Sequence, residues 1–206
     1  MRWLLNIDNP VMRYIVKIFD CMCLSLLWLL FSLPVITAGA STTALYATMY
    51  RYIRKEEGHL WSTFWETFRE NLKRSTLVWL VVLAVTVLLT VDVLVFRTMA
   101  INGELIGKLY WLILVLCCVA VTWAAFLFAY AARFQGSVKD VLRVSFLLMA
   151  VHPIKAVTVF VPVAAGILLA LMAPGLLSIL PAGICLVCSM ILEGVFALHL
   201  PPKEDD

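Results

Sequence analysis

The chain has 206 residues, of which 64% are hydrophobic and 14% charged, and its formal net charge at pH 7 is +3. Its mean hydropathy of +1.00 lies outside the range of soluble domains, because a chain of this length cannot hide so much apolar surface from water. The composition therefore excludes a soluble domain and predicts a membrane protein whose main partner is the lipid bilayer, with no nucleic-acid partner.

Six apolar stretches follow one another along the chain, and they are continuous rather than alternating, which favours membrane helices over a closed barrel. We expect membrane segments at about residues 15–33, 40–53, 75–96, 109–132, 156–173 and 176–200. The first ends at Pro34, and only the Pro174-Gly175 turn separates the last two, which predicts a tight hairpin. The expected fold class is all-α, with residues 1–206 forming a single polytopic membrane domain.

The second stretch is short and rich in small residues. Gly39, Thr43 and Ala47 lie four residues apart on one helical stripe, with Ala40 beside them, and small stripes let helices approach closely in lipid. Its helix would rise about 21 Å, which fits either a tilted short span or a re-entrant element. Two roles remain open: a tightly packed structural helix, or a broken helix that lines a substrate route beside Pro34.

The lysine and arginine residues alternate between the two sides of this layout. If all six stretches are counted as crossings, 14 of the 16 Lys and Arg residues share the side of the amino terminus, and only Arg97 and Lys108 lie opposite. Because basic loops stay in the cytoplasm, both termini are expected to be cytoplasmic, in a cell membrane. Residues 133–155 are then a cytoplasmic loop.

An amphipathic pattern covers about residues 58–73, ahead of the third span. Trp61, Phe64, Trp65 and Phe68 fall with two leucines within about 140° of the helical wheel, and charged residues occupy the other side. Such a helix is expected to lie in the headgroup plane on the cytoplasmic side. Its aromatic face is either a docking face for a partner or an anchor that orients the third span.

Three acidic residues lie within apolar stretches, where a buried charge is costly and often functional. Glu193 is the deepest, and it is a candidate proton or cation site, a polar clasp to another subunit, or a hydrogen-bonded carboxyl that joins two helices. Asp92, the second candidate for an intramembrane polar site, lies toward the outer end of the third span, where it can also reach the interface. Asp20 is placed to pair with Lys17, three residues before it.

The six cysteines all fall within apolar stretches, where cysteine behaves as a small hydrophobe. Cys185 and Cys188 have the C-x-x-C spacing, but no histidine or carboxylate lies close to them in the sequence. We therefore expect no metal, no cofactor and no catalytic residue, and we do not expect an enzyme.

Two runs resemble a known family. The first is LFSLPVITAGASTTALY at residues 30–46, with its Leu-Pro, Thr-x-Gly and Ala-Leu-Tyr pieces, and the second is EGHLWSTFWETFRENLKRSTLVWL at residues 57–80. They are similar to the YesL family of bacterial membrane proteins, a domain of unknown function. The resemblance implies an uncharacterised integral membrane protein that is often encoded beside carbohydrate importers and polysaccharide-degrading enzymes in Gram-positive bacteria.

Two function classes follow from these patterns. The first is a non-enzymatic accessory or scaffold component associated with carbohydrate uptake, whose partners are importer subunits or further copies of itself. Its contact surfaces would be the small-residue stripe and the amphipathic helix. The alternative is a small-solute transporter or channel, with Glu193 and the break between Pro34 and Gly39 along the route.

Overall fold

The computed structural model describes residues 10–54, 59–102 and 105–199, and within these ranges the chain is helical without a strand. The elements are α1 (Pro10–Ser32), η2 (Val35–Thr37), α2 (Ala38–Thr48), η3 (Met49–Arg54), α3 (Leu60–Ile101), η4 (Leu105–Leu109), α4 (Tyr110–Arg133), α5 (Val138–Val151), α6 (Pro153–Met172), η5 (Pro174–Ser178) and α7 (Leu180–His199). Among the described residues, five helices are long and apolar enough to cross a membrane: α1, α3, α4, α6 and α7. The expected all-α polytopic fold is therefore confirmed.

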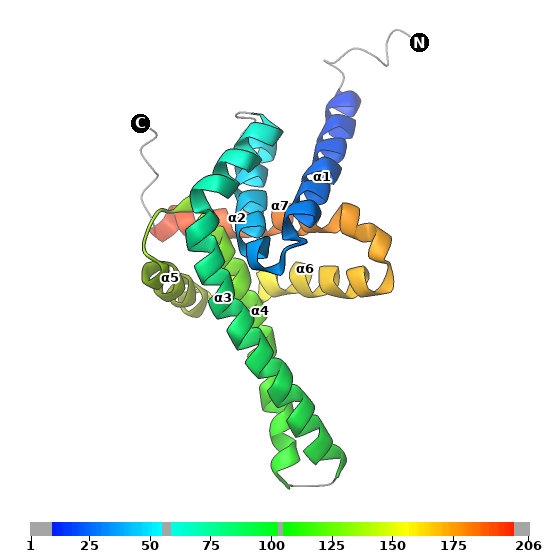
Figure 1. Cartoon of the computed structure of the whole chain (residues 1–206), viewed down its shortest axis with the longest axis vertical. Coiled ribbons are helices and arrows are strands. Elements are labelled where there is room, and N and C mark those ends of the chain that lie inside the picture. The colour runs from blue at the N-terminus through cyan, green and yellow to red at the C-terminus, as the bar shows by residue number, and fades with distance from the viewer. Residues whose placement is uncertain (1–9, 55–58, 103–104, 200–206) are drawn as a thin grey trace.

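Most helices lie where the apolar stretches predict them (Figure 1). The first ends at Ser32, just before Leu33-Pro34, because a residue that precedes proline is biased away from the helical conformation. The last two form the expected hairpin, in which the short helix η5 makes the turn. Helix α2 is not a span by itself, because its 11 residues rise only about 17 Å.

Helix α2 forms the centre of the packed part of the molecule. Nine of its 11 residues are buried, and it packs against α1, α3, α4 and α7. Its hydroxyls bond to backbone carbonyls: Ser41 donates to Trp28 of α1 at 3.0 Å and Thr43 donates to Gly39 at 2.9 Å. A helix with small and internally satisfied side chains can therefore be enclosed on all sides without leaving polar groups unpaired.

Close contact between α2 and α3 occurs at Gly39. A Cβ atom at this position would lie 2.4 Å from the Trp79 Cβ and 2.7 Å from the Ser75 carbonyl oxygen. The Trp79 indole also donates to the Val35 carbonyl, at 2.6 Å, in the turn between α1 and α2. The buried residues of α3 all lie between Thr63 and Val82, so α2 accompanies the first half of α3 and not its second half.

The amphipathic stretch expected as a separate helix is the beginning of α3. Residues 60–101 are one helix of 42 residues, about 63 Å long, or roughly twice the thickness of the bilayer core. The sequence between the two predicted segments contains no glycine or proline, so nothing ends the helix there. Part of its aromatic face packs inward instead of lying free in the headgroup plane: the Phe31 ring of α1 lies 5.8 Å from Phe64 and 5.1 Å from Phe68.

The expected cytoplasmic loop at residues 133–155 contains a helix, α5, that the sequence interpretation missed. Its first turn has a capping arrangement in which the Ser137 backbone N–H donates to Asp140 Oδ2 at 3.1 Å. Val141, Ser145 and Leu148 turn one face of α5 inward. The S-x-x-D spacing ahead of this apolar pattern was the available signal for a helix. The charged residues of the stretch favoured the interpretation as a loop instead.

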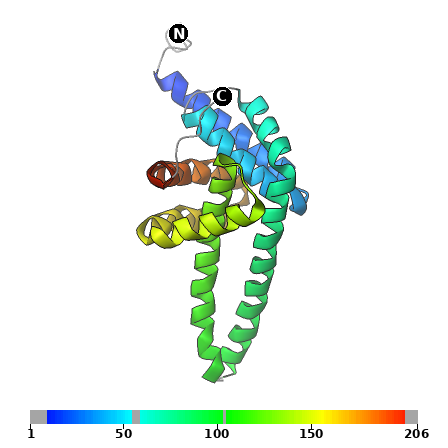
Figure 2. The same ribbon diagram turned by 90° about the vertical axis from the view of Figure 1, so that its left-hand side faces the viewer.

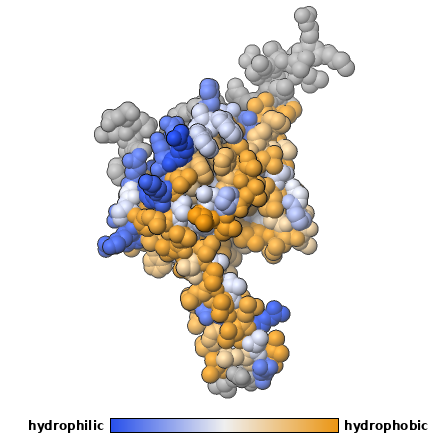
Figure 3. All heavy atoms as spheres, in the orientation of Figure 1, coloured by the Kyte–Doolittle hydropathy of each residue, from blue (hydrophilic) through white to orange (hydrophobic). Residues whose placement is uncertain are grey.

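The distal part of the α3–α4 hairpin projects from the rest of the molecule, and we call residues 83–121 the arm (Figures 1 and 2). Gly107 is the only buried residue among those described in this range. In Figure 1 α6 and α7 run across the hairpin and not alongside it. Apolar side chains cover most of the visible arm, with hydrophilic ones near its tip (Figure 3). The membrane side of each loop, and the crossing by residues 40–53, stay predictions.

We expect Gly39→Ala to destabilise the protein. The added methyl group meets a backbone oxygen and a Cβ atom that cannot rotate away, so overpacking outweighs the better helix propensity of alanine. The expected loss is about 1–3 kcal/mol, or a fall in Tm of about 2–4 °C for each kcal/mol, measured by thermal unfolding in detergent micelles. Gly183→Ala is the control, since no atom lies within 4 Å of a Cβ there. Equal melting temperatures for the two variants would contradict the close approach.

Candidate functional site

A buried ion pair lies between the end of α4 and helix α7. Arg133 is the last residue of α4, and its Nη2 is 3.2 Å from Oε2 of Glu193. Glu193 is 8% exposed, whereas about a quarter of the Arg133 side chain remains accessible. A guanidinium at a helix C-terminus also interacts favourably with the helix dipole. The deepest carboxylate in the sequence is therefore neutralised by a residue from a distant part of the chain.

Two tyrosines from the central segment complete this cluster. The Tyr46 hydroxyl of α2 donates to Oε1 of Glu193 at 3.4 Å, and Tyr46 is itself 4% exposed. Four residues later, the Tyr50 ring in η3 lies 4.0 Å from the guanidinium carbon of Arg133, a cation–π contact. Tyr46 and Tyr50 share one helical face, so they reach the two ends of the ion pair.

Aromatic rings surround the outer side of the cluster. Phe134 lies next to Arg133 in the chain, and its ring centroid is 4.9 Å from that of Tyr130 and 5.7 Å from that of Phe196. Phe196, one turn beyond Glu193 on α7, is 2% exposed. Packing of this kind limits the access of water to Glu193 and strengthens its electrostatic attraction to Arg133.

The arrangement favours one of the three interpretations of Glu193. Both carboxylate oxygens are engaged within the chain, one by Tyr46 and the other by Arg133, and the partners come from α2 and α4. A site that binds a transported proton or cation would need a carboxylate oxygen that faces the path of the ion. The geometry instead supports a carboxyl group that joins α2, α4 and α7.

A second guanidinium, which the sequence interpretation treated only as a loop charge, holds the same end of α4. Arg74 of α3 donates to the carbonyl oxygens of Phe134 at 3.0 Å and Gly136 at 3.4 Å, and it also bonds to that of Ala131. Asn71 orients it through a 3.0 Å hydrogen bond. Because the last carbonyls of a helix have no partner within the helix, Arg74 supplies them with donors. The position of Arg74 at the start of an apolar stretch was the sequence feature that could have indicated this role.

The other two acidic residues of the apolar stretches, Asp92 and Asp20, are not part of the cluster around Glu193. Asp92 lies on the arm and is half-buried there. Asp20 of α1 accepts a hydrogen bond of 3.1 Å from the Tyr52 hydroxyl in η3. The contact of Asp20 with Lys17 stays a prediction, and the contact with Tyr52 shows that Asp20 joins α1 to the segment that follows α2.

The small-residue stripe lies inside the packed body. Gly39, Ala40, Thr43 and Ala47 are all buried, in keeping with a packed structural helix, whereas Pro34 is exposed in the turn before α2. This turn is separated from the Glu193 cluster by most of α2, because Gly39 and Tyr46 are about 10 Å apart along the helix axis. The two features that the transport alternative places along one route are therefore at different ends of α2.

The candidate docking face is divided by the fold. Phe64 and Phe68 are buried, with exposed fractions of 1% and 6%, and only Trp61 and Trp65 keep substantial exposure, at 57% and 39%. The Trp65 ring still contacts Phe31, at 5.6 Å between centroids. What remains available to a partner or to lipid is therefore the edge formed by the two tryptophans.

The cysteines with C-x-x-C spacing, Cys185 and Cys188, are buried free thiols on α7. Within residues 10–54, 59–102 and 105–199, no three His, Cys, Asp or Glu side chains are grouped so that they could hold a metal ion.

Part of this site lies in a segment of the chain that matches a known protein family. Residues 21–93, about one third of the chain, match a family described as "Protein of unknown function, DUF624". The match supports a resemblance to this family of unknown function, and it names no activity. The matched segment contains Tyr46, Tyr50 and Arg74, and it ends before Arg133 and Glu193. No curated protein and no solved structure matches the chain.

We expect Glu193→Gln to lower the free energy of unfolding by about 3 kcal/mol. Removal of one partner of a buried ion pair leaves the other charge uncompensated, and the partial exposure of Arg133 keeps the loss near the lower end of the usual range. Tyr46→Phe removes one neutral donor and should cost about 1 kcal/mol. Thermal unfolding in detergent micelles measures both changes.

Two further variants make this test specific. The double variant Arg133→Met/Glu193→Met should be more stable than either single Met variant, because it leaves no unpaired charge. Asp92→Asn, at a half-buried carboxylate on the arm, should change the stability by less than about 0.5 kcal/mol. If the effects of the two Met substitutions are additive, the pair contributes no coupling, and the conclusion that it joins α4 to α7 is wrong.

Proposed function

We propose that this protein is a non-enzymatic accessory component of a membrane complex for carbohydrate uptake, and that it binds its partner through the arm. The observation that carries this proposal is the exposure of the arm, where Gly107 alone is buried among the described residues of 83–121. The rest of the two membrane helices packs against α2, α5, α6 and α7. A projecting pair of helices therefore offers its whole outer surface to a membrane neighbour.

The arm has the chemistry of a segment that stays within lipid. Its most exposed apolar residues include Val87, Leu88, Val91, Leu94, Trp111, Leu112 and Val115, each more than half exposed. Arg97 and Lys108 lie near the tip, and the Tyr110 and Trp111 rings stand beside each other at the start of α4, with 5.8 Å between their centroids. Basic and aromatic residues of this kind are typical of the membrane interface.

Packing, and not exclusion of water, must drive association at such a surface. Lipid chains are as apolar as leucine, so helices associate in a bilayer through shape, close approach and hydrogen bonds. Thr86 and Thr90 donate to carbonyls of their own helix, at 2.8 Å and 2.7 Å, so apart from the half-buried Asp92 the middle of the arm has an apolar contact surface. A membrane helix of a partner subunit fits this chemistry better than a soluble protein does.

The association with carbohydrate uptake has a different support. It comes from the similarity of residues 30–46 and 57–80 to the YesL family, which implies proximity to carbohydrate importers. The partner we infer is therefore a membrane subunit of such an importer, and self-association is the competing outcome.

Photocrosslinking from the arm tests this proposal. A photoreactive phenylalanine analogue at Val91 or Leu112 should yield a crosslinked product with an importer membrane subunit when native membranes are irradiated. The same analogue at Ile154 of α6, which is 81% exposed but far from the arm in the chain, is the matched control and should yield much less of that product. Mass spectrometry of the purified tagged product identifies the partner.

Two outcomes would count against the proposal. A product with twice the mass of the chain, obtained from both arm positions, would assign the arm to self-association. Recovery of the protein alone in mild detergent, with crosslinks only to lipid, would remove the partner altogether.

A further inference from the structure

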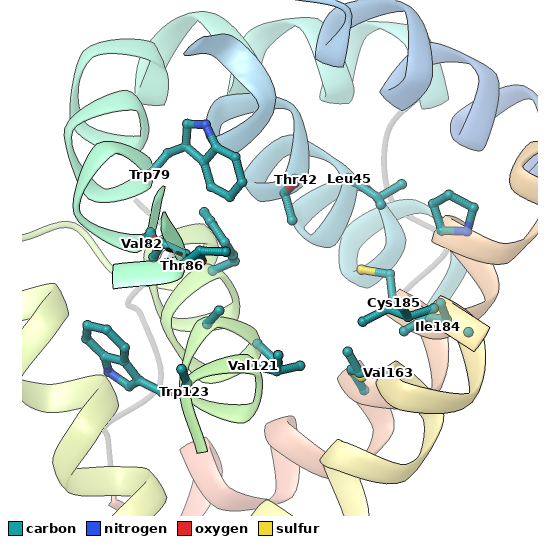
Figure 4. A pocket seen from close by; sticks show the side chains of 18 of the residues that line it. Thr42, Leu45, Trp79, Val82, Thr86, Val121, Trp123, Val163, Ile184 and Cys185 are labelled. Atoms are coloured by element: carbon teal, nitrogen blue, oxygen red, sulfur yellow. Dashed lines mark hydrogen bonds between the residues drawn. The ribbon is translucent and has the colours of Figure 1, made fainter. Parts of the chain in front are cut away.

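A cavity of about 670 Å³ lies in the corner between the base of the arm and the α6–α7 hairpin. Its walls come from α1, α2, α3, α4, α6 and α7, with Leu45, Val121, Val163 and Ile184 among the side chains that face the space in Figure 4. The volume falls within the range of about 300–1,000 Å³ that is usual for sites that bind small ligands. The corner therefore has room for a ligand and not only for a packing defect.

The threonines in the lining have already used their hydroxyl donors. Thr42 donates to the Ala38 carbonyl at 2.8 Å, and Thr86 and Thr90 bond to carbonyls one turn earlier on α3. The fourth hydroxyl in the lining belongs to Tyr46, which donates to Glu193. None of the four is left to donate to a polar ligand unless it breaks an existing bond.

The indole N–H groups of the cavity lining also donate their hydrogen bonds within the protein. Trp28 donates to Thr42 Oγ1 at 3.1 Å, Trp79 donates to the Val35 carbonyl at 2.6 Å, and Trp123 donates to Ser145 Oγ at 3.2 Å. Their rings contribute apolar surface while their N–H groups are bonded to the protein. A sugar or other polyhydroxylated solute would lose its own hydrogen bonds to water in this space and find few in return. The occupant must therefore be a hydrocarbon.

The cavity also opens toward the surroundings of the membrane helices. Its lining ranges from buried residues such as Leu45 and Cys188 to the exposed residues Thr86, Thr90 and Ile167 on α3 and α6. Both helices are long and apolar enough to cross a membrane, so the medium at this opening is lipid. An empty apolar space loses dispersion contacts on every wall, and a flexible chain that enters from the side restores them.

We propose that this cavity is a binding site for one acyl chain of a bilayer phospholipid. The inference goes beyond the accessory function and does not depend on it, because the chain occupies the inner corner and the proposed partner contacts the outer surface of the arm. The cavity lining includes neither Arg133 nor Glu193, and Tyr46 is the lining residue that also bonds to Glu193. Lipid bound there would fill the corner that the crossing of α6 and α7 over the hairpin creates.

Photolabelling with a defined lipid tests the site. The full chain is purified in a bile-salt detergent, whose rigid rings do not imitate an acyl chain, and is given a phosphatidylglycerol with a diazirine at the end of its palmitoyl chain. Irradiation followed by peptide mass spectrometry should place the label on residues 120–128 and 180–188, and unlabelled phospholipid should compete. Label spread evenly along the arm, or protection by a soluble sugar and not by phospholipid, would overturn the proposal.

Cavity-filling substitutions provide an independent measurement. Ala120→Phe with Ala170→Phe puts two rings into the space, and exclusion of even two methylene groups should weaken lipid binding by about tenfold. Ala165→Phe is the matched control, because Ala165 is an exposed residue of α6 outside the cavity lining. Equal labelling of the filled and control variants would overturn the proposal. If the filled variant does not fold, the position of the label on the unsubstituted protein decides the question.

Discussion

Enclosure of α2 by four helices is the constraint on which the rest of the structure depends. The helix can be surrounded by α1, α3, α4 and α7 because nine of its 11 residues are small and because its Ser and Thr hydroxyls bond to nearby carbonyls. Close approach at Gly39 then sets the position of α3 beside it. From this central position, Tyr46 and the following Tyr50 reach the Arg133–Glu193 pair, so the packing of a small-residue helix also builds the polar cluster.

Several polar groups inside the body join helices to one another. Arg133 neutralises Glu193, and Arg74 donates to the last carbonyls of α4, so two guanidinium groups hold the same helix end. Ser25 of α1 accepts a hydrogen bond of 3.2 Å from the Ala182 backbone N–H near the start of α7. In a membrane, where water cannot satisfy these groups, such contacts are costly to lose and they specify how the helices meet.

The molecule consequently has two kinds of surface within the membrane. The arm is convex and apolar, with its hydroxyls bonded internally, whereas the corner at its base is concave and equally apolar. A convex helical surface is suited to contact with another helix, and a concave one to a flexible chain. The polar cluster lies in the packed body and connects with the corner through Tyr46. In our proposals, the outer surface of the arm binds the partner, the corner binds lipid, and the polar cluster stabilises the packed body.

The sequence by itself determined the class of protein and the positions of most helices, because long apolar runs and the proline after α1 have local consequences. It also identified Glu193 and the small stripe as unusual. The partners of Glu193 could not be predicted, because Tyr46 and Arg133 are 147 and 60 residues away in the chain and a single sequence carries no signal of such contacts. Only tertiary packing decided that the aromatic side of residues 60–73 partly turns inward, that α5 packs against the body, and that α6 and α7 cross the hairpin. Each of these depends on which neighbour covers an apolar face.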